Sequence, residues 1–405
     1  TAANNTALGY YALLANTTGT GNTALGSLAG DALTVGGFNT AIGHTALGAD
    51  TKGKHSVAIG YGALTSQNFT SLTNSLNVAI GNNSLYTNTT GVTNTGVGYG
   101  TLYSNTTGNS NVAIGNDALA TNTTASNNTS IGTYSLQLNT TGADNVAIGA
   151  YALDANTTAA NGTAVGRNAL SSNTTGGSNT GLGSHALVGN TTGQENVAIG
   201  VNALSSNTTA AGNTAVGKAS LAANTTGSGN VAMGYQSADA NTTGTNHTAL
   251  GYNALSGNTT GNSNTAVGYS ALEANTTASN NTAVGLLALG ANTTGDRNVA
   301  FGALALDANT TADANTAVGY EALTTNTTAE GNTAVGFGAI RLNTTGGSNT
   351  GIGQNALNAN TTASNNTAVG QAALAANTTA DDNTAVGASS LDANTTGSAN
   401  TSVGQ

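Results

Sequence analysis

The sequence lacks Cys, Pro and Trp altogether and carries very little charge. Without Cys, its 405 residues can form neither disulfides nor thiolate metal sites. Charged residues make up 5% of the chain, against about a quarter in ordinary globular proteins, so groups other than charges must hydrate its surface. Six Lys and Arg residues and a formal net charge of −10 exclude the basic patches on which nucleic-acid binding depends.

Long hydrophobic runs are also missing. No stretch approaches the roughly 18 apolar residues of a membrane-spanning helix, and the first residues do not resemble a signal peptide. We therefore expect no membrane insertion of this segment. The chain starts at Thr1 without an initiator Met, which points to a processed protein or to a piece of a longer one.

What the sequence does contain is one 17-residue repeat. The block Asn-Thr-Ala-Val-Gly-x-x-Ala-Leu-x-x-Asn-Thr-Thr-Gly-x-x starts at residues 5, 22, 39 and 56 and then every 17 residues from 77 to 400, which gives 24 starts. We number its first Asn as position 1. An insertion of four residues falls within 65–76, where we expect a loop on one turn. Residues 1–405 therefore form a single continuous repeat array instead of two or three globular domains.

Positions 2 to 5 predict a short strand. Position 2 is always Thr or Val, position 4 is a larger apolar residue and position 3 between them is small, an alternation typical of β-structure. We expect positions 2 and 4 to face the core, a second strand at positions 7 to 10 with Leu at position 9 pointing inward, and a turn at Asn-Thr-Thr-Gly. A helix is disfavoured, because Gly, Asn and Thr fill the block.

Position 5 is Gly in every copy, as at Gly60, Gly115, Gly217 and Gly319. This constancy indicates a backbone with positive φ or one too crowded for a Cβ atom. Ala replaces the Gly of position 15 in several copies, as at Ala125, so positive φ is not required there.

Strands this short become stable when identical turns stack and pair in register. The fold class is therefore all-β, a parallel β-solenoid or β-roll with 17-residue turns and about 24 of them. Stacking would also align the Asn residues of positions 1 and 12 into amide ladders. Outside residues 39–55, charged residues occur only at positions 6, 7, 10, 16 and 17, which we expect to face solvent.

The predicted strand avoids charge on both of its faces. A lone solenoid needs only one dry face, so we expect the small residues of position 3 to meet another chain, with a homotrimer as the preferred assembly. The alternative is a monomer whose Ala row faces water. The array also starts and stops without a polar cap, which favours further covering domains or an end-to-end polymer.

The repeat itself resembles that of a known family. Ser56-Val57-Ala58-Ile59-Gly60 and the Asn-Val-Ala-Ile-Gly segments at 77, 111, 145 and 196 resemble the head repeats of trimeric autotransporter adhesins. The fuller block, as at 264–278, is similar to repeats of phage tail-fibre-like proteins. The resemblance covers nearly the whole chain and implies a left-handed parallel β-roll in a homotrimer, displayed on a cell or virion surface. The period is longer than in typical adhesin heads, and no heptad stalk or membrane anchor is visible.

Tyr favours position 6 on neighbouring turns. Tyr235, Tyr252 and Tyr269 lie on three consecutive turns, and Tyr320 is followed by Phe337. An exposed aromatic row could bind surface glycans or pack against a neighbouring fibre, although each ring could equally cover the edge of its own turn.

Each Asn-Thr-Thr is also an acceptor sequence for N-glycosylation on a predicted turn. Sugars there would help to hydrate an uncharged surface; the alternative is that Asn and Thr simply suit the turn. The candidate sites include Asn88, Asn105, Asn122, Asn139, Asn156, Asn173, Asn190, Asn207 and Asn224.

The repeat gives little support to catalysis or to cofactor and metal binding, because a reacting site needs unlike groups to converge. His44, His55, His185 and His247 are far apart in the array, and we expect them on the surface. Asp381 and Asp382 lack partners in the pattern, so a solvated loop is favoured over a calcium site.

These patterns predict a structural, non-enzymatic extracellular fibre, serving as an adhesive or spacer. The alternative is the receptor-binding or glycan-binding head of an adhesin or tail fibre. Rows of Thr keep an ice-binding solenoid as a minor alternative, although paired Thr beside Gly is not an alternating Thr-x-Thr lattice.

Overall fold

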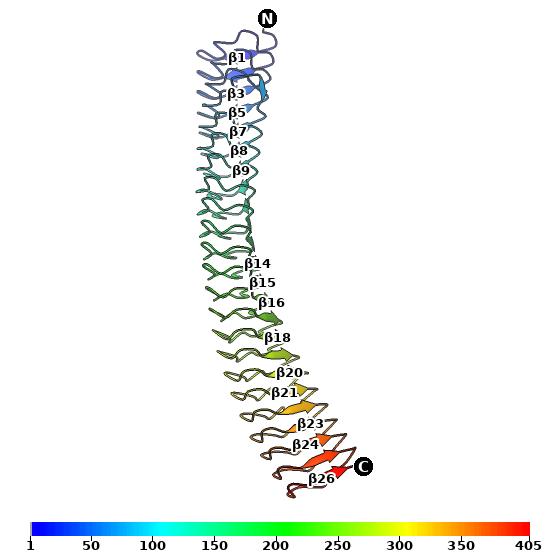
Figure 1. Ribbon diagram of the computed structural model, residues 1–405. Coiled ribbons are helices and arrows are strands. Elements are labelled where there is room, and N and C mark those ends of the chain that lie inside the picture. The colour runs from blue at the N-terminus through cyan, green and yellow to red at the C-terminus, as the bar shows by residue number, and fades with distance from the viewer. Residues whose placement is uncertain (1) are drawn as a thin grey trace. The chain divides into compact units, whose positions relative to one another are not determined.

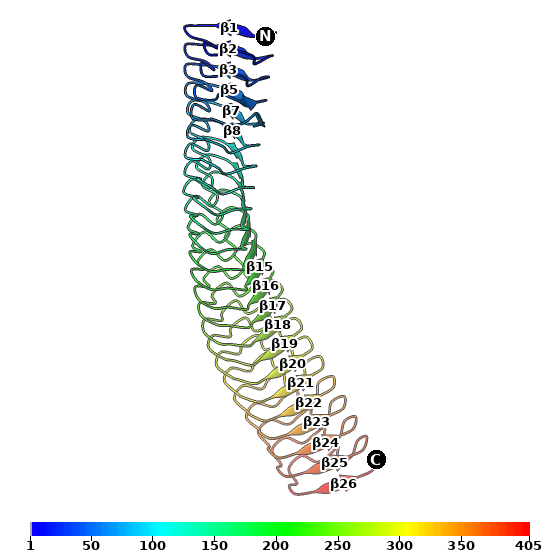
Figure 2. The same ribbon diagram turned by 45° about the horizontal axis from the view of Figure 1, so that its top comes forward.

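A computed structural model describes residues 2–405 as an all-β parallel β-solenoid with turns of about 17 residues (Figures 1 and 2). The predicted fold class is therefore confirmed, and the described residues contain no helix. The chain divides into two compact units, Thr1–Asn202 with Asn207–Thr209 and Ala203–Ser206 with Ala210–Gln405. We refer to these as the N-terminal and C-terminal units. Residues 2–405 also contain no helix that is long and apolar enough to span a membrane.

Each unit repeats one three-residue strand per turn, and the N-terminal unit has two additional strands of two residues near the insertion. The strands of the N-terminal unit are β1 (Thr6–Leu8), β2 (Thr23–Leu25), β3 (Thr40–Ile42), β4 (Gly53–Lys54), β5 (Val57–Ile59), β6 (Thr73–Asn74), β7 (Val78–Ile80), β8 (Thr95–Val97), β9 (Val112–Ile114), β10 (Thr129–Ile131), β11 (Val146–Ile148), β12 (Thr163–Val165), β13 (Thr180–Leu182) and β14 (Val197–Ile199).

The strands of the C-terminal unit are β15 (Thr214–Val216), β16 (Val231–Met233), β17 (Thr248–Leu250), β18 (Thr265–Val267), β19 (Thr282–Val284), β20 (Val299–Phe301), β21 (Thr316–Val318), β22 (Thr333–Val335), β23 (Thr350–Ile352), β24 (Thr367–Val369), β25 (Thr384–Val386) and β26 (Thr401–Val403). In Figure 2 they lie one beyond the next.

Neighbouring turns pair in parallel with each residue opposite its own repeat position. In the C-terminal unit Thr265 pairs with Thr282, Ala266 with Ala283 and Val267 with Val284. The same register recurs along both units, so each row of side chains holds one type of residue, as the sequence predicts.

The two faces of the strand are the reverse of those expected. Residues of position 3 are the buried ones: Ala266, Ala283 and Ala300 have no exposed surface. Positions 2 and 4 on either side of them are half-buried or exposed. The prediction that the small-residue row meets another chain was therefore wrong, because that row forms the interior of the turn.

The interior is narrow because the Leu of position 9 fills it from the opposite side. At Gly181, which occupies position 3 of β13, an added Cβ atom would lie 3.4 Å from the Leu170 side chain. A β-branched residue would leave no room for that Leu, so only a small residue fits.

The predicted second strand at positions 7 to 10 is also wrong. These residues form a turn in which positions 7 and 9 adopt positive φ, 50° at Ser270 and 51° at Leu272. This conformation lets the Ser270 N–H donate to Tyr252 O on the preceding turn (2.9 Å) and the Leu272 N–H donate to Ala288 O on the following turn (3.0 Å). Ala271 and Leu272 are both fully buried by this tight reversal.

Gly at position 5 meets both conditions that the sequence predicted. Its φ is 131° at Gly217 and 138° at Gly319, and it is similarly positive at Gly60 and Gly115. An added Cβ atom on Gly217 would lie 2.7 Å from the carbonyl carbon of Gly234 on the next turn. Stacked backbones thus exclude any side chain here.

Candidate functional site

The candidate site is the outward sheet face, which we define as the side chains of positions 2 and 4. It is a flat surface of alternating Thr or Val and a larger apolar residue, repeated on every strand of the main sheet. The residues of position 4 that expose most surface in the C-terminal unit, apart from the last strand, are Met233, Phe301, Ile352 and Val386. No charged residue occurs at either position in any turn. Over residues 2–405 the surface has no pocket.

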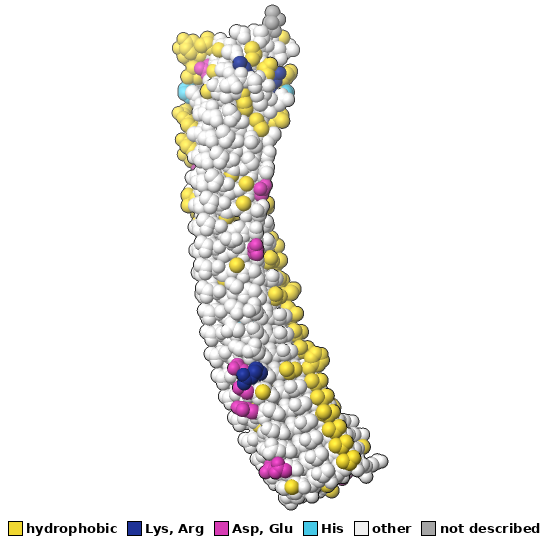
Figure 3. All heavy atoms as spheres, in the orientation of Figure 1, with side chains coloured by type: hydrophobic (Ala, Val, Ile, Leu, Met, Phe, Trp, Pro, Cys, Tyr) yellow, Lys and Arg dark blue, Asp and Glu magenta, His cyan; other side chains and the backbone are white. Residues whose placement is uncertain are grey.

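Figure 3 shows hydrophobic side chains gathered in a row along one edge of the C-terminal unit. The face turned to the viewer is polar and carries few charges. Monomeric proteins rarely expose large contiguous apolar patches, which makes this row the candidate contact surface.

The position-6 aromatic side chains stack on one another beside this face. The ring centroids of Tyr235 and Tyr252 are 5.2 Å apart, and those of Tyr252 and Tyr269 are 5.3 Å apart, with the planes nearly parallel. Lys218 Nζ lies 5.7 Å from the Tyr235 centroid. Because each ring covers the face of the next, the row presents its edges and hydroxyl groups to a ligand.

Tyr320 and Phe337 form a second stack of this kind, with centroids 5.7 Å apart. The sequence analysis did not single out Tyr86 and Tyr103, which stack at 5.1 Å on neighbouring turns. Both occupy position 10, and their spacing of one repeat was the signal that could have revealed them.

The candidate glycosylation residues lie inside the turn. Asn88, Asn105 and Asn122 have no exposed surface. Asn105 Nδ2 donates both to Asn88 Oδ1 (2.8 Å) and to Gly108 O (3.1 Å). A sugar on Nδ2 would replace a buried hydrogen and break this network, so glycosylation does not fit the folded turn. The same burial applies to Asn139, Asn156, Asn173, Asn190, Asn207 and Asn224.

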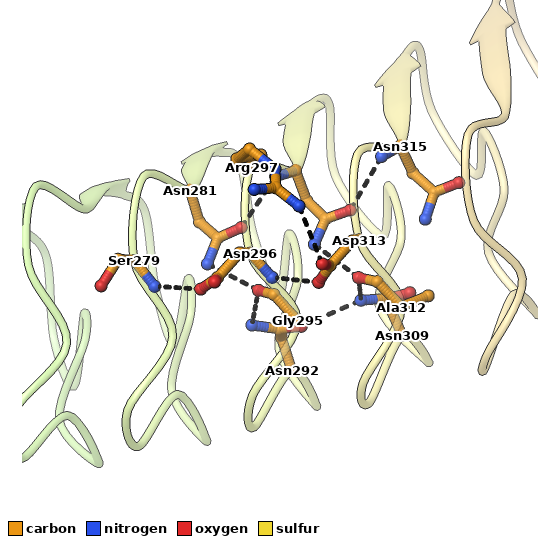
Figure 4. Close-up of polar contacts among 11 residues, drawn as sticks. Ser279, Asn281, Asn292, Gly295, Asp296, Arg297, Asn309, Ala312, Asp313 and Asn315 are labelled. Atoms are coloured by element: carbon orange, nitrogen blue, oxygen red, sulfur yellow. Dashed lines mark hydrogen bonds and ion pairs between the residues drawn. The ribbon is translucent and has the colours of Figure 1, made fainter.

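The predicted amide ladder of position 12 is confirmed by these contacts. It continues in the C-terminal unit, where Asn292 donates to Asn275 and Asn309 donates to Asn292. Position 1 forms a mixed ladder instead: the backbone N–H of Asn315 donates to Asn298 Oδ1 (2.9 Å), while Asn298 Nδ2 donates to Ala312 O (2.7 Å). Figure 4 shows these ladders on neighbouring turns. Buried amides therefore bond every turn to the next.

Position 16 adds a third ladder that the sequence analysis missed. Asp296 Oδ1 accepts from the Ser279 N–H (2.6 Å), and Asp313 Oδ1 accepts from the Asp296 N–H (2.7 Å) (Figure 4). Arg297 pairs with Asp313 at 3.0 Å. These carboxylates bond to the backbone of the previous turn, which accounts for the acidic residues at this position.

His247 contradicts the surface prediction made for all four His residues. It replaces the Asn of position 1, is 1% exposed, and its Nδ1 accepts from the Asn264 N–H (3.2 Å). Burial lowers the pKa of His247 to about 4. His44 and His55 are exposed and His185 is half-buried.

The inserted segment keeps the ladder with different residues. Asp50 and Gln67 occupy position 12 of their turns and are both buried; Gln67 Nε2 donates to Asp50 Oδ2 (2.7 Å) and Asn77 Nδ2 donates to Gln67 Oε1 (2.8 Å). Burial raises the pKa of the Asp50 carboxyl despite these bonds. Short strands β4 and β6 pair beside the extra residues, so the insertion leaves the stacking of turns intact.

Asp381 and Asp382 are exposed, and Asp381 Oδ1 accepts from the Ser364 N–H (2.7 Å). Among residues 2–405, no three His, Asp or Glu side chains come together as a metal site would require.

Comparison with known proteins gives no family: no family model and no curated protein matches the sequence significantly. The β-roll architecture is consistent with the resemblance of the repeat motif to adhesin heads.

Proposed function

We propose that the protein is a structural, non-enzymatic fibre component, displayed on a cell or virion surface, whose chains associate as a homotrimer through the outward sheet face. The observation that carries this proposal is the charge-free outward sheet face, in which an apolar residue at position 4 recurs beside Thr or Val at position 2 on the strands of each unit. The sequence analysis expected position 3 to contact another chain, whereas we now propose that positions 2 and 4 do so. The proposed partner is still a second copy of this chain.

The size of the outward sheet face is sufficient for a stable contact. A side chain whose full burial contributes about 1.5 to 3 kcal/mol has roughly 60 to 120 Å² of apolar surface. With about a third of that exposed at two positions per strand, the twelve strands of one unit offer on the order of 700 Å² in all, part of it the polar hydroxyl groups of the Thr residues at position 2. Stable interfaces bury about 800 Å² per partner, so the face of one unit comes close to the area that a stable contact needs.

A second copy of this chain is the partner that matches the face. Its apolar side chains recur at the strand spacing of about 4.8 Å, and a partner that packs along many turns must present groups at the same spacing. The chain itself does so, and neither copy brings a charge into the contact. The resemblance to adhesin heads supports a trimer and surface display.

The native mass tests this proposal. We expect wild-type protein to have the mass of a trimer in analytical ultracentrifugation. The double variant Val267→Asp/Val284→Asp, which places two carboxylates on the outward sheet face, should be monomeric. Thr260→Asp/Thr277→Asp adds the same charge at exposed position 14 and should remain trimeric.

A monomeric wild-type protein at micromolar concentration would refute the proposal. Equal dissociation of both double variants would show that charge alone, and not the position of the charge, controls association.

The stacked aromatic row supports one alternative, a head that binds surface glycans. Tyr235, Tyr252 and Tyr269 are 39%, 46% and 54% exposed, and their hydroxyl groups could bond to sugar hydroxyls. Binding on a glycan array that survives Tyr→Phe substitution at these residues but is lost on Tyr→Ala would indicate ring contacts; loss in both would indicate the hydroxyl groups. No binding by the wild-type protein would remove this alternative.

The ice-binding alternative gains little from the Thr rows. At position 13 the Thr hydroxyl already donates to the next turn, as Thr276 Oγ1 does to Thr293 O (3.0 Å). Absence of thermal hysteresis would end this alternative.

A further inference from the structure

Because all turns are alike, two copies of the chain could associate side by side in several alignments that differ by whole turns. Val267, Val284, Val318 and Val335 occupy position 4 of four strands in the C-terminal unit. If one copy slid past another by one turn, most Val side chains would again meet Val, Ile or Leu. Register is weakly specified wherever neighbouring pairings are this similar.

Two strands of the C-terminal unit break the repeat. In β16 and β20, position 4 is Met233 and Phe301, where every other strand of the unit has Val, Leu or Ile. The same two strands have Val231 and Val299 at position 2, where all the others have Thr. These four residues are 36% to 55% exposed. On each of the two exceptional strands, the side chains of both position 2 and position 4 are therefore accessible to a partner.

The larger of these side chains has a small residue two positions further along the chain. Next to Phe301, position 6 is Ala303, although the preceding turn has Leu286 there and the following turn has Tyr320. The outward sheet face thus carries one bulky aromatic group with a small neighbour, four strands away from the flexible Met233.

We propose that the Val231–Met233 and Val299–Phe301 pairs are register keys, which align C-terminal units of associated chains turn for turn. This inference rests on the proposed association of outward sheet faces. In the aligned state, Phe301 of one copy meets Phe301 of the next at the same level, as parallel packing around a common axis requires.

Misalignment removes these matched contacts. A slip by one turn brings each Phe301 against Val284 or Val318 of the other copy, which overfills one contact and leaves a void at another; both changes destabilise a packed interface. A slip by four turns would bring β16 beside β20, but it would leave four strands of each unit without a partner. The aligned state is therefore favoured over both.

Disulfide trapping measures the register directly, because the chain has no Cys. Thr282→Cys lies on β19, between the keys, and Thr265→Cys lies one turn earlier on β18. Two chains carrying one of these substitutions each, with different mass tags, are mixed, unfolded, refolded together and oxidised. We expect disulfides between identical positions to exceed those between positions 265 and 282 by about tenfold, since disulfides form only over short Cβ distances.

Removal of the keys should abolish this preference. In the background Val231→Thr/Met233→Val/Val299→Thr/Phe301→Val, which gives both strands the commonest residues, we expect the ratio to approach one while the trimer mass is retained. Ile352→Val also shortens an outward side chain, but β23 pairs with β22 and β24 and not with either key strand, so it should leave the ratio unchanged.

Moving the keys supplies the decisive experiment. A chain with both keys transferred one turn onward, to β17 and β21, is mixed with a chain that has them in place. The preferred disulfide should then join position 282 of the transferred chain to position 265 of the other.

An unchanged tenfold preference after key removal, or trapping of identical positions after key transfer, would overturn the inference while the trimer mass remained. A monomeric wild-type protein would instead refute the association on which it rests.

Discussion

At the scale of single residues, stability depends on side chains that bond one turn to the next inside a very narrow interior. Asn at positions 1 and 12 is buried on nearly every turn, and its amide satisfies backbone carbonyl groups that would otherwise lack partners. Buried polar groups stabilise a fold only when they are paired. A change of one such residue therefore has large effects, whereas a change of an exposed Thr has small ones.

His247 should make stability depend on pH. Its pKa is about 4 in the folded chain, below the ordinary value of 6.5, because a positive charge on this buried imidazole would be cut off from water. The unfolded chain therefore binds a proton first as pH falls through 6.5. Stability is complete above that pH and declines toward pH 4, by about 3 kcal/mol in all.

His247→Asn restores the position-1 ladder and should remove this decline. Urea unfolding of both proteins at pH 7 and pH 4.5 gives the comparison, in which the carboxyl groups common to both chains cancel. Equal losses of stability in the two proteins would show that His247 does not titrate in this window.

At the scale of the element, each turn consists of a three-residue strand, a reversal with positive φ and two ladders. The ladders stabilise the turn alongside the burial of Ala and Leu, which are its principal apolar core residues. This differs from an ordinary β-sandwich, in which larger β-branched residues face inward.

Asn275→Ala should destabilise its turn and both neighbours. It removes the donor to Asn258 Oδ1 and Ala278 O and the acceptor for Asn292 Nδ2. Each buried group left unpaired costs about 1 to 3 kcal/mol, so we expect a loss of about 2 to 4 kcal/mol. Hydrogen exchange should show faster exchange over the turns that start at 247, 264 and 281.

Thr277→Ala is the matched control, because Thr277 lies in the same turn but is exposed. We expect it to change the free energy of unfolding by less than about 0.5 kcal/mol. An equal effect of both substitutions would contradict a central role for the amide ladder.

The sequence predicted those features of the turn that each follow from one invariant position. Constant Gly at position 5 predicted a backbone in contact with its neighbour, and the Asn that fills positions 1 and 12 of nearly every turn predicted the ladders. It did not predict which strand face is buried, because neither face carries charge and the larger residues of positions 2 and 4 suggested a core. The decisive factor, the space taken by Leu at position 9, depends on how the turn folds back.

The repeat pattern also failed to predict the reversal at positions 7 to 10 and the burial of His247. The reversal at positions 7 to 10 places Leu272 at positive φ, which bulky residues rarely adopt, so a strand was the more reasonable prediction. A residue that replaces the usual one at a repeat position, such as His247, is buried or exposed as that position is in the other turns. Position 1 is buried in nearly all of those turns, so its repeat position could have predicted that His247 is buried.

At the scale of the whole molecule, the repeat predicts that turns are interchangeable within a unit. Deletion of residues 265–281 removes one complete turn and joins Asn264 to Thr282, which preserves the block. We expect the shortened protein to unfold within a few degrees of wild type, because a repeat array loses one turn and one contact between neighbours.

Deletion of residues 271–272 alone should be far more damaging than deletion of the whole turn. It leaves a 15-residue turn without its buried Ala271 and Leu272, and loss of one buried Leu alone costs about 2 to 5 kcal/mol. Calorimetry of the two deletion variants makes the comparison, and greater damage from the whole-turn deletion would contradict the independence of turns.

The fit of each turn to copies of itself also determines how such a gene can evolve. Unequal recombination between repeats adds or removes whole turns, and the new junction has the same Gly, Asn and Ala contacts as every other one. Selection can therefore change the length of the array without first solving a new folding problem. Under the proposed association, substitutions on the outward sheet face would then distinguish lineages, since chains whose bulky residues lie on different turns would align out of step with one another.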